Sequence, residues 1–446
     1  MSLAVALLLC CASPASAAAG SRTLKMRFGP VDVHGYATET GGNHVRTPRV
    51  DGFITAMHAQ LVDSHGRAIP QERVMLHHVF FANEGRFDGD RQGGDCANRR
   101  SETFYGTGEE NQAIEFPAGF GYRIRRDDRW RLGWMFMNHR NSAARVYLQY
   151  TVTVTDSPRM TPVTPYWISV SCAFGKIYSV PGGDSPGAVH ARSRTWVVPR
   201  GGRIVTAAAH AHGGALRVSL SRQGCDEMLA SDARYGGPED PIYQLSPVLH
   251  EPSPRSMTVL TSATGWTVSR GDRLRVTSTY SGEHPHSAVM GIMHVYVAPG
   301  PGRSERCPAP PADVRAHRLP FPGAPGRDAP PLVTSELSEL GSDGVARPVA
   351  ALAGPVQVAS GDVTVAVKNA GYSPRKLSVP SGATVRWSFQ DPIRHDVTLA
   401  GGPRAFASYY LLRGATYSKR LTTPGEYRIF CSLHPVAMSQ TIEVRP

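Results

Sequence analysis

The chain has 446 residues, 41% of them hydrophobic, and a formal net charge of +12. This length allows two to four domains, and beyond the N-terminus no apolar run is long enough to cross a membrane. Only five of the 48 basic residues are lysine, and the arginines are scattered along the chain. They form no basic stripe with aromatic platforms, so we expect no nucleic-acid partner.

The N-terminal segment, residues 1–19, has the pattern of a secretory signal. Residues 3–11 form a short apolar core, and Ala15-Ser16-Ala17 or Ala17-Ala18-Ala19 would suit a signal peptidase. The pattern departs from the usual one because no Lys or Arg precedes Arg22. We therefore expect an exported protein, periplasmic, cell-surface or extracellular, that keeps no membrane span once the signal is removed.

The region from residue 20 to residue 305 is predicted to be β-structure. The 45 Gly and 36 Pro of the chain favour short strands and turns, and no 3.6-residue apolar stripe indicates a helix. Strands are expected at residues 73–81, 131–137, 146–154, 166–171, 203–210, 216–220, 273–279 and 289–297. This region is large for one sandwich, so we predict two jelly-roll-like β-sandwiches, at residues 20–160 and 161–305.

A linker is predicted to follow at residues 306–354. Ten prolines lie between Pro299 and Pro331, and aromatic residues stay rare as far as Gly354. Such a composition is typical of an extended, partly disordered segment. The remaining residues, 355–446, form the last predicted domain, with strands at 363–368, 376–379, 384–389 and 426–430.

The last domain contains a Cys-x2-His-x3-Met loop formed by Cys431, His434 and Met438. Type 1 copper takes two imidazoles, one thiolate and a weak axial thioether. The loop offers three of these ligands, and the fourth must come from a distant strand end because one loop cannot encircle the metal. His395, 36 positions before the cysteine, is the expected fourth ligand. The sequence therefore predicts a type 1 copper site.

Residues 356–444 resemble the cupredoxins, the family that includes plastocyanin. The resemblance implies a Greek-key β-sandwich whose copper transfers electrons. Many cupredoxins have Gly just before the axial Met, whereas this chain has Ala437. This departure leaves the expected ligand set intact.

The remaining cysteines predict disulfide bonds. Cys10 and Cys11 lie in the signal segment, and Cys431 is assigned to copper. The four others are Cys96, Cys172, Cys225 and Cys307. An even number in an exported protein indicates two disulfides, and three pairings are open.

Histidines recur at strand positions in the region before the linker. His210 and His212 are two residues apart, so on a strand they share a face and can chelate one metal. The adjacent His77 and His78 should point to opposite faces. Their joint ligation requires a β-bulge or a strand end, and otherwise one of them is structural. His139 follows a further apolar strand.

The order of these motifs resembles the copper type II, ascorbate-dependent monooxygenases, the family of peptidylglycine α-hydroxylating monooxygenase. The likeness runs from about residue 70 to residue 300 and is strongest at residues 117–122 and at the strand before His139. It also resembles a stress-upregulated, nodulin-like group of bacterial and plant proteins. The monooxygenase resemblance implies two sandwiches that each bind one copper across a wet cleft. Its ligand sets map to His77, His78 and His139, and to His210, His212 and Met290, with His284, His286 and Met293 as alternatives.

Two departures from the hydroxylase bear on the substrate. Ala208 occupies the position of an Arg that grips a peptide carboxylate, and Ile292 and His294 replace an Asn and a Tyr. Burying a carboxylate without a cation is costly, so we do not expect peptide amidation.

The sequence thus predicts an exported multi-copper redox protein. In the first hypothesis it is an oxidoreductase of monooxygenase type with unassigned catalytic residues. Its cupredoxin domain relays electrons between an external partner and two mononuclear coppers that act on O2 and a small molecule. The alternative is a non-catalytic protein that stores or passes on copper, or carries electrons without oxygen chemistry. The substrate, the electron donor and the oligomeric state stay open.

Overall fold

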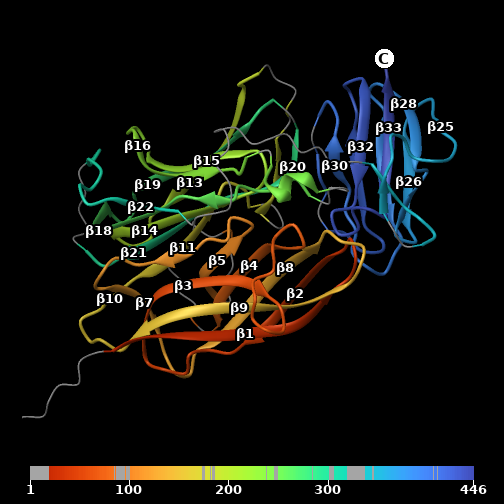
Figure 1. The fold of residues 1–446 in the computed structure, drawn as a ribbon. Helices are drawn as coiled ribbons and strands as arrows, with labels where there is room; N and C mark the ends of the chain where they lie inside the picture. Colours follow the sequence, from red (N-terminus) through yellow and green to blue (C-terminus); the bar gives the residue numbers. More distant parts are fainter. Residues whose placement is uncertain are drawn as a thin grey trace, which may run out of the picture.

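The computed structural model describes residues 20–84, 86, 96, 101–172, 176–180, 182, 186–237, 239–245, 250–283, 285–300, 306–318, 337–343, 346–404, 406–408 and 410–446. The expected signal segment and His284 lie outside these residues. The described part is built of β-strands and short 3-10 turns, without an α-helix, which confirms the all-β class. None of its helical turns approaches the length and apolarity of a membrane span. Two β-sandwiches lie one above the other, and a third lies beside them (Figure 1).

The first sandwich extends from β1 to β10. Its strands are β1 (Ser21–Val33), β2 (Thr38–Val45), β3 (Gly52–Val62), β4 (Val74–Glu84), β5 (Ser101–Gly108), β6 (Ile114–Glu115), β7 (Phe120–Ile124), β8 (Arg129–Asn138), β9 (Ala144–Thr155) and β10 (Thr161–Pro162). One sheet has the order β1-β9-β3-β7-β10, with β6 paired to β3, and the other has the order β2-β8-β4-β5. The chain leaves this sandwich after β10, just past the boundary expected at residue 160.

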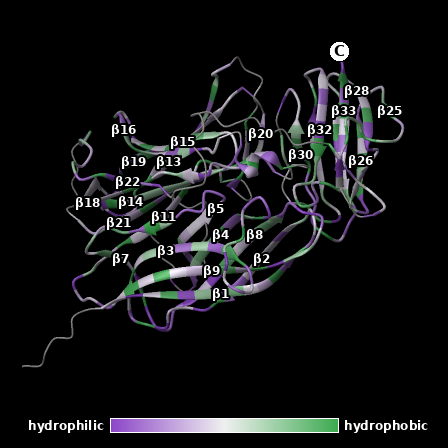
Figure 2. Ribbon diagram, viewed as in Figure 1, coloured by the Kyte–Doolittle hydropathy of each residue, from purple (hydrophilic) through white to green (hydrophobic). Residues whose placement is uncertain are grey.

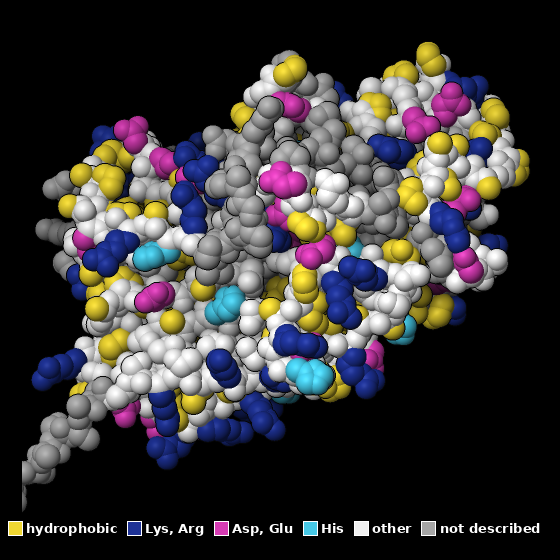
Figure 3. Space-filling view, viewed as in Figure 1, with side chains coloured by type: hydrophobic (Ala, Val, Ile, Leu, Met, Phe, Trp, Pro, Cys, Tyr) yellow, Lys and Arg dark blue, Asp and Glu magenta, His cyan; other side chains and the backbone are white. Residues whose placement is uncertain are grey.

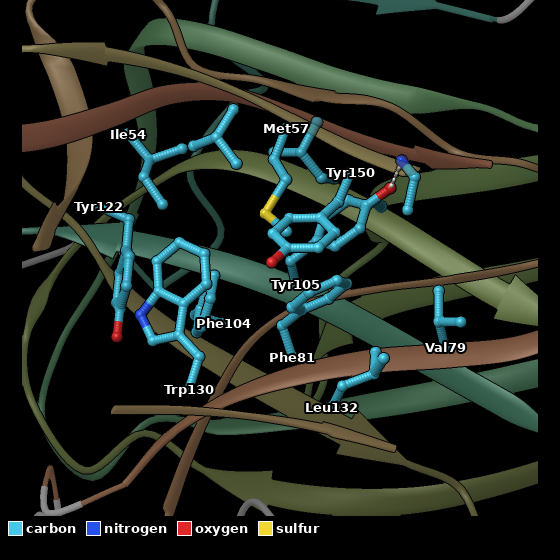
Figure 4. Packing of buried hydrophobic residues seen from close by; sticks show 14 of the residues in the cluster. Ile54, Met57, Val79, Phe81, Phe104, Tyr105, Tyr122, Trp130, Leu132 and Tyr150 are labelled. Atoms are coloured by element: carbon cyan, nitrogen blue, oxygen red, sulfur yellow. Dashed lines mark hydrogen bonds between the residues drawn. The ribbon is translucent and has the colours of Figure 1, made fainter. Parts of the chain in front are cut away.

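Alternating apolar residues create the core of the first sandwich. Along β9 every second residue from Val146 to Val154 is buried, as a strand with one face toward a core requires. The same alternation is visible as bands of colour along the strands (Figure 2). Aromatic rings from both sheets fill the centre, where Phe81 lies 5.1 Å from Tyr150 between ring centroids (Figure 4). This core fixes β4, which carries His77 and His78, and β8, which His139 follows.

The second sandwich extends from β11 to β22. Its strands are β11 (Thr164–Ser169), β12 (Tyr178–Val180), β13 (Val189–Val197), β14 (Gly202–Ala211), β15 (Ala215–Arg222), β16 (Glu227–Arg234), β17 (Ser256–Met257), β18 (Val259–Val268), β19 (Arg273–Ser281), β20 (His286–Val289), β21 (Gly291–Ala298) and β22 (Arg315–His317), with the 3-10 helix η2 (Pro241–Gln244). Its sheets have the orders β11-β21-β14-β18-β22 and β13-β19-β15-β16-β17, and β12 pairs with β20.

Part of the expected linker is structured. Strand β22 pairs with β18, and the Ser262 hydroxyl and the Thr264 N–H both donate to the carboxylate of Asp313. These contacts fasten residues 306–318 to the second sandwich, whereas residues 319–336 lie outside the described part. The expectation of an extended linker at residues 306–354 therefore does not hold for its first segment, because backbone pairing holds that segment to a sheet edge.

Two disulfides join the four cysteines whose pairing the sequence leaves open. Cys96 bonds to Cys172 and Cys225 bonds to Cys307. The first bridge links the two sandwiches, and the second links the β15–β16 turn to the segment before β22. Both are typical of a protein that matures in an oxidising compartment.

The third sandwich has two sheets and a preceding hairpin. Its strands are β23 (Ser338–Leu340), β24 (Ala346–Pro348), β25 (Gln357–Val358), β26 (Val363–Lys368), β27 (Gly371–Ser373), β28 (Lys376–Pro380), β29 (Thr384–Phe389), β30 (Thr398–Gly401), β31 (Thr416–Arg420), β32 (Gly425–Phe430) and β33 (Ser439–Arg445). The sheet orders are β25-β28-β33-β32-β30 and β27-β26-β29-β31. Strand β30 lies against β20 of the second sandwich (Figure 1).

Candidate metal centres

The loop after β32 brings the predicted type 1 ligands together. Cys431 Sγ lies 3.5 Å from His434 Nδ1 and 3.9 Å from His395 Nδ1. The loop is a tight turn, because the His434 N–H donates to the Cys431 carbonyl and the Met438 N–H donates to the His434 carbonyl. Met438 is fully buried in the same apolar cluster as Cys431. His395 lies just before β30, so a distant segment does supply the fourth candidate ligand.

The separations in this group fit a three-coordinate N2S plane. Metal–sulfur bonds of about 2.3 Å and metal–nitrogen bonds of about 2.0 Å, at about 120°, place sulfur and nitrogen about 3.7 Å apart. The observed distances of 3.5 and 3.9 Å lie on either side of this value. Burial raises the pKa of the Cys431 thiol well above its usual value, so the thiolate requires a cation beside it. The residues therefore fit copper.

Two carboxylates organise the surroundings of this group. Asp391 Oδ2 lies 2.9 Å from His395 Nε2, and this hydrogen bond turns the Nδ1 atom toward Cys431. The Ser432 N–H donates to Asp396 Oδ1 at 2.6 Å, and the Ser432 hydroxyl donates to Asp396 Oδ2. The ligand loop is thereby held to the segment that carries His395.

The ligand loop also rests on the first sandwich. Val436 packs against Tyr36, and the Thr38 hydroxyl donates to the Ser432 carbonyl at 3.2 Å. Glu39 is near enough to His434 to oppose the lowering of its pKa by burial and by His395. His434 is half-buried at this junction. The third sandwich therefore meets the first through the edge that carries its candidate copper ligands.

A second concentration of histidines lies between the first and second sandwiches. Strand β4 has a bulge between Leu76 and His78, as joint ligation by adjacent histidines requires. The His77 and His78 rings consequently lie near each other, 4.0 Å apart between centroids. From the facing strand β14, His210 and the residue after its end, His212, approach the same place.

The rings form a continuous buried cluster across the two sandwiches. His78 Nε2 lies 2.8 Å from His212 Nε2, and ring centroids are 4.4 Å apart for His77 and His250 and 4.9 Å apart for His78 and His210. Ligand atoms of His77, His78 and His212 lie within 4.8 Å of one another. Burial lowers the pKa of these three imidazoles well below the usual value, so each is neutral.

Adjacent glutamates orient imidazoles from both sandwiches. Glu109 Oε1 lies 2.7 Å from His77 Nδ1, and both oxygens of Glu110 lie 3.1 Å from His210 Nδ1. Glu109 also accepts the Ser253 N–H at 2.7 Å, and burial raises the pKa of this carboxyl to about 8. Such carboxylate–histidine pairs are typical of metal sites, where they set the tautomer and leave the other nitrogen free. Among the residues that the structure describes, His210 Nε2 indeed has no hydrogen-bond partner.

The structure does not separate these histidines into the two groups that the monooxygenase resemblance implies. His212 joins His77 and His78, whereas among the described residues His139 belongs to no close group of metal-ligating atoms. His139 is nevertheless buried with both ring nitrogens unpartnered, and burial and His250 lower its pKa to about 3. In the described part of the chain the facing imidazoles are at least largely buried and in contact with one another.

The other candidate ligands have different surroundings. Met290 is partly buried, and its carbonyl accepts the Tyr280 hydroxyl. Met293 is fully buried on β21 within the apolar core of the second sandwich. His286 Nδ1 lies 2.7 Å from Glu251 Oε2, and its Nε2 has no hydrogen-bond partner within the described part of the chain.

Sequence reasoning missed several residues of both sites. Glu109, Glu110 and His250 complete the buried cluster, and Asp391 orients His395. Glu109 and Glu110 are consecutive acidic residues directly after a strand. This pair was a sequence signal that could have pointed to the site, because acidic side chains are rarely buried at a strand end. His250 lies in a loop with no pattern around it, and nothing in its sequence neighbourhood points to the cluster.

Comparisons with known proteins agree with parts of this description. The family model described as "Stress up-regulated Nod 19" matches residues 129–300. A search of curated proteins finds no match. Among solved structures, a Cu(I) form of an amicyanin variant is 25% identical, over 19% of this chain and 83% of that one, with a TM-score of 0.18. A purple cupredoxin from Nitrosopumilus maritimus is also 25% identical, over 19% of this chain and all of that one, with a TM-score of 0.18.

These findings confirm the likeness to the stress-upregulated, nodulin-like group over residues 129–300. The monooxygenase likeness stays a hypothesis. The assignment of copper to the third sandwich is argued from the converging donor atoms of His395, Cys431 and His434.

Proposed function

We propose that the chain is an exported multi-copper redox protein whose type 1 copper site exchanges electrons with the histidine-rich region of the two other sandwiches. Copper at the Cys431 site supplies one electron at a time by cycling between Cu(I) and Cu(II). An external electron donor or acceptor, and a small molecule with O2, are its proposed partners. The two disulfides support a location in the periplasm, at the cell surface or outside the cell.

One observation carries this proposal: a continuous chain of bonds connects the Cys431 loop with His139, which lies near enough to His250 of the histidine cluster for His250 to lower its pKa. Ser432, next to Cys431, accepts a hydrogen bond from the Thr38 hydroxyl at 3.2 Å. The neighbouring Ala37 carbonyl accepts the N–H of Asn138 at 3.0 Å, and Asn138 directly precedes His139. Two hydrogen bonds and the covalent bonds of Ser432, Thr38, Ala37 and Asn138 therefore lead from the cysteine ligand to a buried histidine.

The residues at this junction keep the route intact and dry. Val436 packs on Tyr36 and covers one side of the contact. Asn138 is fully buried, and its amide donates to the carbonyls of Val33 and Ser142, which fixes the start of the loop that carries His139. A docked arrangement suits electron transfer better than the transient visits expected from a long linker, because no diffusion step precedes the transfer.

A small pocket beside this route offers a place for a polar molecule. It has a volume of about 370 Å³ and is lined by Arg73, Asn138, Arg140, Ser142, Ala143 and Ala144. The Arg73 carbonyl accepts the N–H of His139. The two arginines favour an anionic occupant.

Substitution of Thr38 tests the electron exchange. In copper-loaded protein, the type 1 site is reduced by a light pulse and its reoxidation is followed in the red absorption band. Thr38→Val removes a hydrogen bond worth about 1 kcal/mol and interrupts the route, so the docking equilibrium constant should fall about fivefold and the exchange rate should fall. The matched control is Thr40→Val, because Thr40 lies on the same strand and is exposed. If the type 1 site does not exchange electrons with the other coppers even in the unaltered protein, the proposal fails.

The alternative function is copper storage or transfer without oxygen chemistry. It is favoured by the burial of the facing histidines, whose contact leaves no room for O2 between them. Substrate-dependent O2 uptake by copper-loaded protein would exclude this alternative.

A further inference from the structure

The cluster of imidazoles between the first and second sandwiches contains a group that belongs to neither sandwich alone. His77 and His78 come from β4, and His212 follows β14. Ligand atoms of the three lie within 4.8 Å of one another, and all of them are at least largely buried. We propose that His77, His78 and His212 hold one transition-metal ion that clasps the two sandwiches together, with Glu109 as the residue that positions His77.

The distance between the facing nitrogens fits a shared metal. His78 Nε2 and His212 Nε2 are 2.8 Å apart. Two metal–nitrogen bonds of about 2.0 Å enclose an angle of about 90° at that separation, within the range that first-row metals accept. Neutral imidazoles suit copper and zinc, and the burial of the group excludes competing water.

The glutamates supply the orientation that the imidazoles around such an ion need. Glu109 binds His77 Nδ1 at 2.7 Å and so leaves Nε2 as the ligand atom of that ring. Its second oxygen accepts the Ser253 N–H, which keeps Glu109 in the positioning role. Glu110, bound to His210, adds a second buried acidic side chain within the same cluster.

The alternative to a metal is a plain hydrogen bond between His78 and His212. That bond accounts for one pair of nitrogens, but not for the third imidazole or for the bulge that turns His77 and His78 to the same side. A bulge that re-aims a side chain is typical of a functional site. The assignment also differs from a three-histidine site within one sandwich, because it replaces His139 by His212.

Metal titration of full-length protein carrying Cys431→Ser tests the clasp. This substitution silences the type 1 site, so the ligand-field bands of added Co(II) report the remaining sites. His78→Ala and His212→Ala should each weaken binding at least about 100-fold, because even loss of an outer partner costs about 10–100-fold. The double variant should lose no more than either single one. Glu109→Gln should weaken binding about 10–100-fold, and His139→Ala should leave it unchanged.

A second readout tests the bridging directly. Metal that binds only the native arrangement raises the unfolding temperature of the two sandwiches. This rise should disappear in His212→Ala and also in the more conservative His212→Gln, and should persist in His139→Ala. X-ray absorption of the Co(II) form should count three imidazole nitrogens on a single ion.

Three results would overturn the clasp. Loss of binding in His139→Ala with normal binding in His212→Ala would place the metal within the first sandwich. If His78→Ala and His212→Ala each lost a different ion, each sandwich would have its own metal site. Absence of Co(II) and Cu(I) binding in well-folded protein would leave a hydrogen bond only. The metal clasp deepens the proposed function, but the two are tested separately. Electron exchange is measured from the absorption of the Cys431 site, whereas metal binding at the clasp is measured in protein that lacks Cys431.

Discussion

Asp391 provides a sharp test of the type 1 site, because this carboxylate supports the buried ligand His395. Asp391 Oδ2 accepts from His395 Nε2 at 2.9 Å and from the Ala370 N–H at 2.9 Å, while Oδ1 accepts the Asn369 N–H at 2.8 Å. In Asp391→Ala the imidazole loses a charge-assisted hydrogen bond worth about 1.5–3 kcal/mol. Since 1.4 kcal/mol is a factor of ten, copper affinity should fall about 10–100-fold.

Asp391→Asn should have the smaller effect. An amide that turns its oxygen toward His395 keeps that bond, but its NH2 group then faces the Asn369 N–H. The opposite orientation loses both the His395 and the Ala370 hydrogen bonds, so the first orientation, which loses a single bond, is preferred and the expected fall in affinity is nearer tenfold. Copper affinity should therefore be highest in the unaltered protein, lower in Asp391→Asn and lowest in Asp391→Ala.

Copper competition against a chelator, followed in the red charge-transfer band of Cys431, measures these affinities. Asp362→Ala is the control, because Asp362 lies in the same sandwich, is exposed and bonds only to the N–H of Thr384 among the contacts described. The copper-free variants should first be shown to be folded by circular dichroism. Unchanged affinity in Asp391→Ala would refute the argument that this carboxylate organises the site.

Three further predictions concern other parts of the chain. Met438→Leu should keep the blue colour and raise the reduction potential, since the weak axial ligand tunes it; loss of copper would instead make Met438 a primary anchor. A glycine-extended peptide offered with ascorbate and O2 should not be hydroxylated, because Ala208 and Ile292 are buried and supply no cation for the peptide carboxylate. Turnover at ordinary enzymatic rates would contradict this prediction. Hydrogen bonds from Ser262 and Thr264 lower the pKa of Asp313 to about 2. The contribution of the Asp313 carboxylate to stability is therefore present above about pH 4 and is lost as the pH falls through 2. Protection factors of Arg315–His317, which correct amide exchange rates for their intrinsic pH dependence, should fall over that interval and stay constant in Asp313→Asn, whereas equal pH responses in the two proteins would exclude this role.

The parts of the structure that depend on local sequence could be predicted. The strand expected at residues 384–389 matches β29, and that at 363–368 matches β26, because a period of two in apolar residues specifies a half-buried strand. The spacing of Cys431, His434 and Met438 likewise encodes one tight turn. The scattered arginines remain distributed over much of the visible face (Figure 3).

The parts that depend on how distant segments pack could not be predicted. His212 meets His78 only because two sheets from different sandwiches face each other, and no local pattern encodes that contact. The same holds for His250, and for Cys225, which could have paired with any of three cysteines. The contact of the ligand loop with Tyr36 was missed. The composition of a proline-rich linker indicates how far the third sandwich can extend from the others, but not which surface it contacts.

The bulge in β4 has a consequence for sequence variation. Side chains alternate along a strand, so the facing of every residue beyond a bulge depends on whether one extra residue is present. Deleting Leu76 would restore regular pairing with β8 and keep both histidines, but adjacent residues of a regular strand face opposite sides, so one histidine of the pair would turn away from its partner. A length change of one in this strand can therefore switch the histidine site off while the sandwich still folds. Among sequences of similar fold, the number of residues in this strand should separate chains with the site from chains without it better than the presence of the His-His pair.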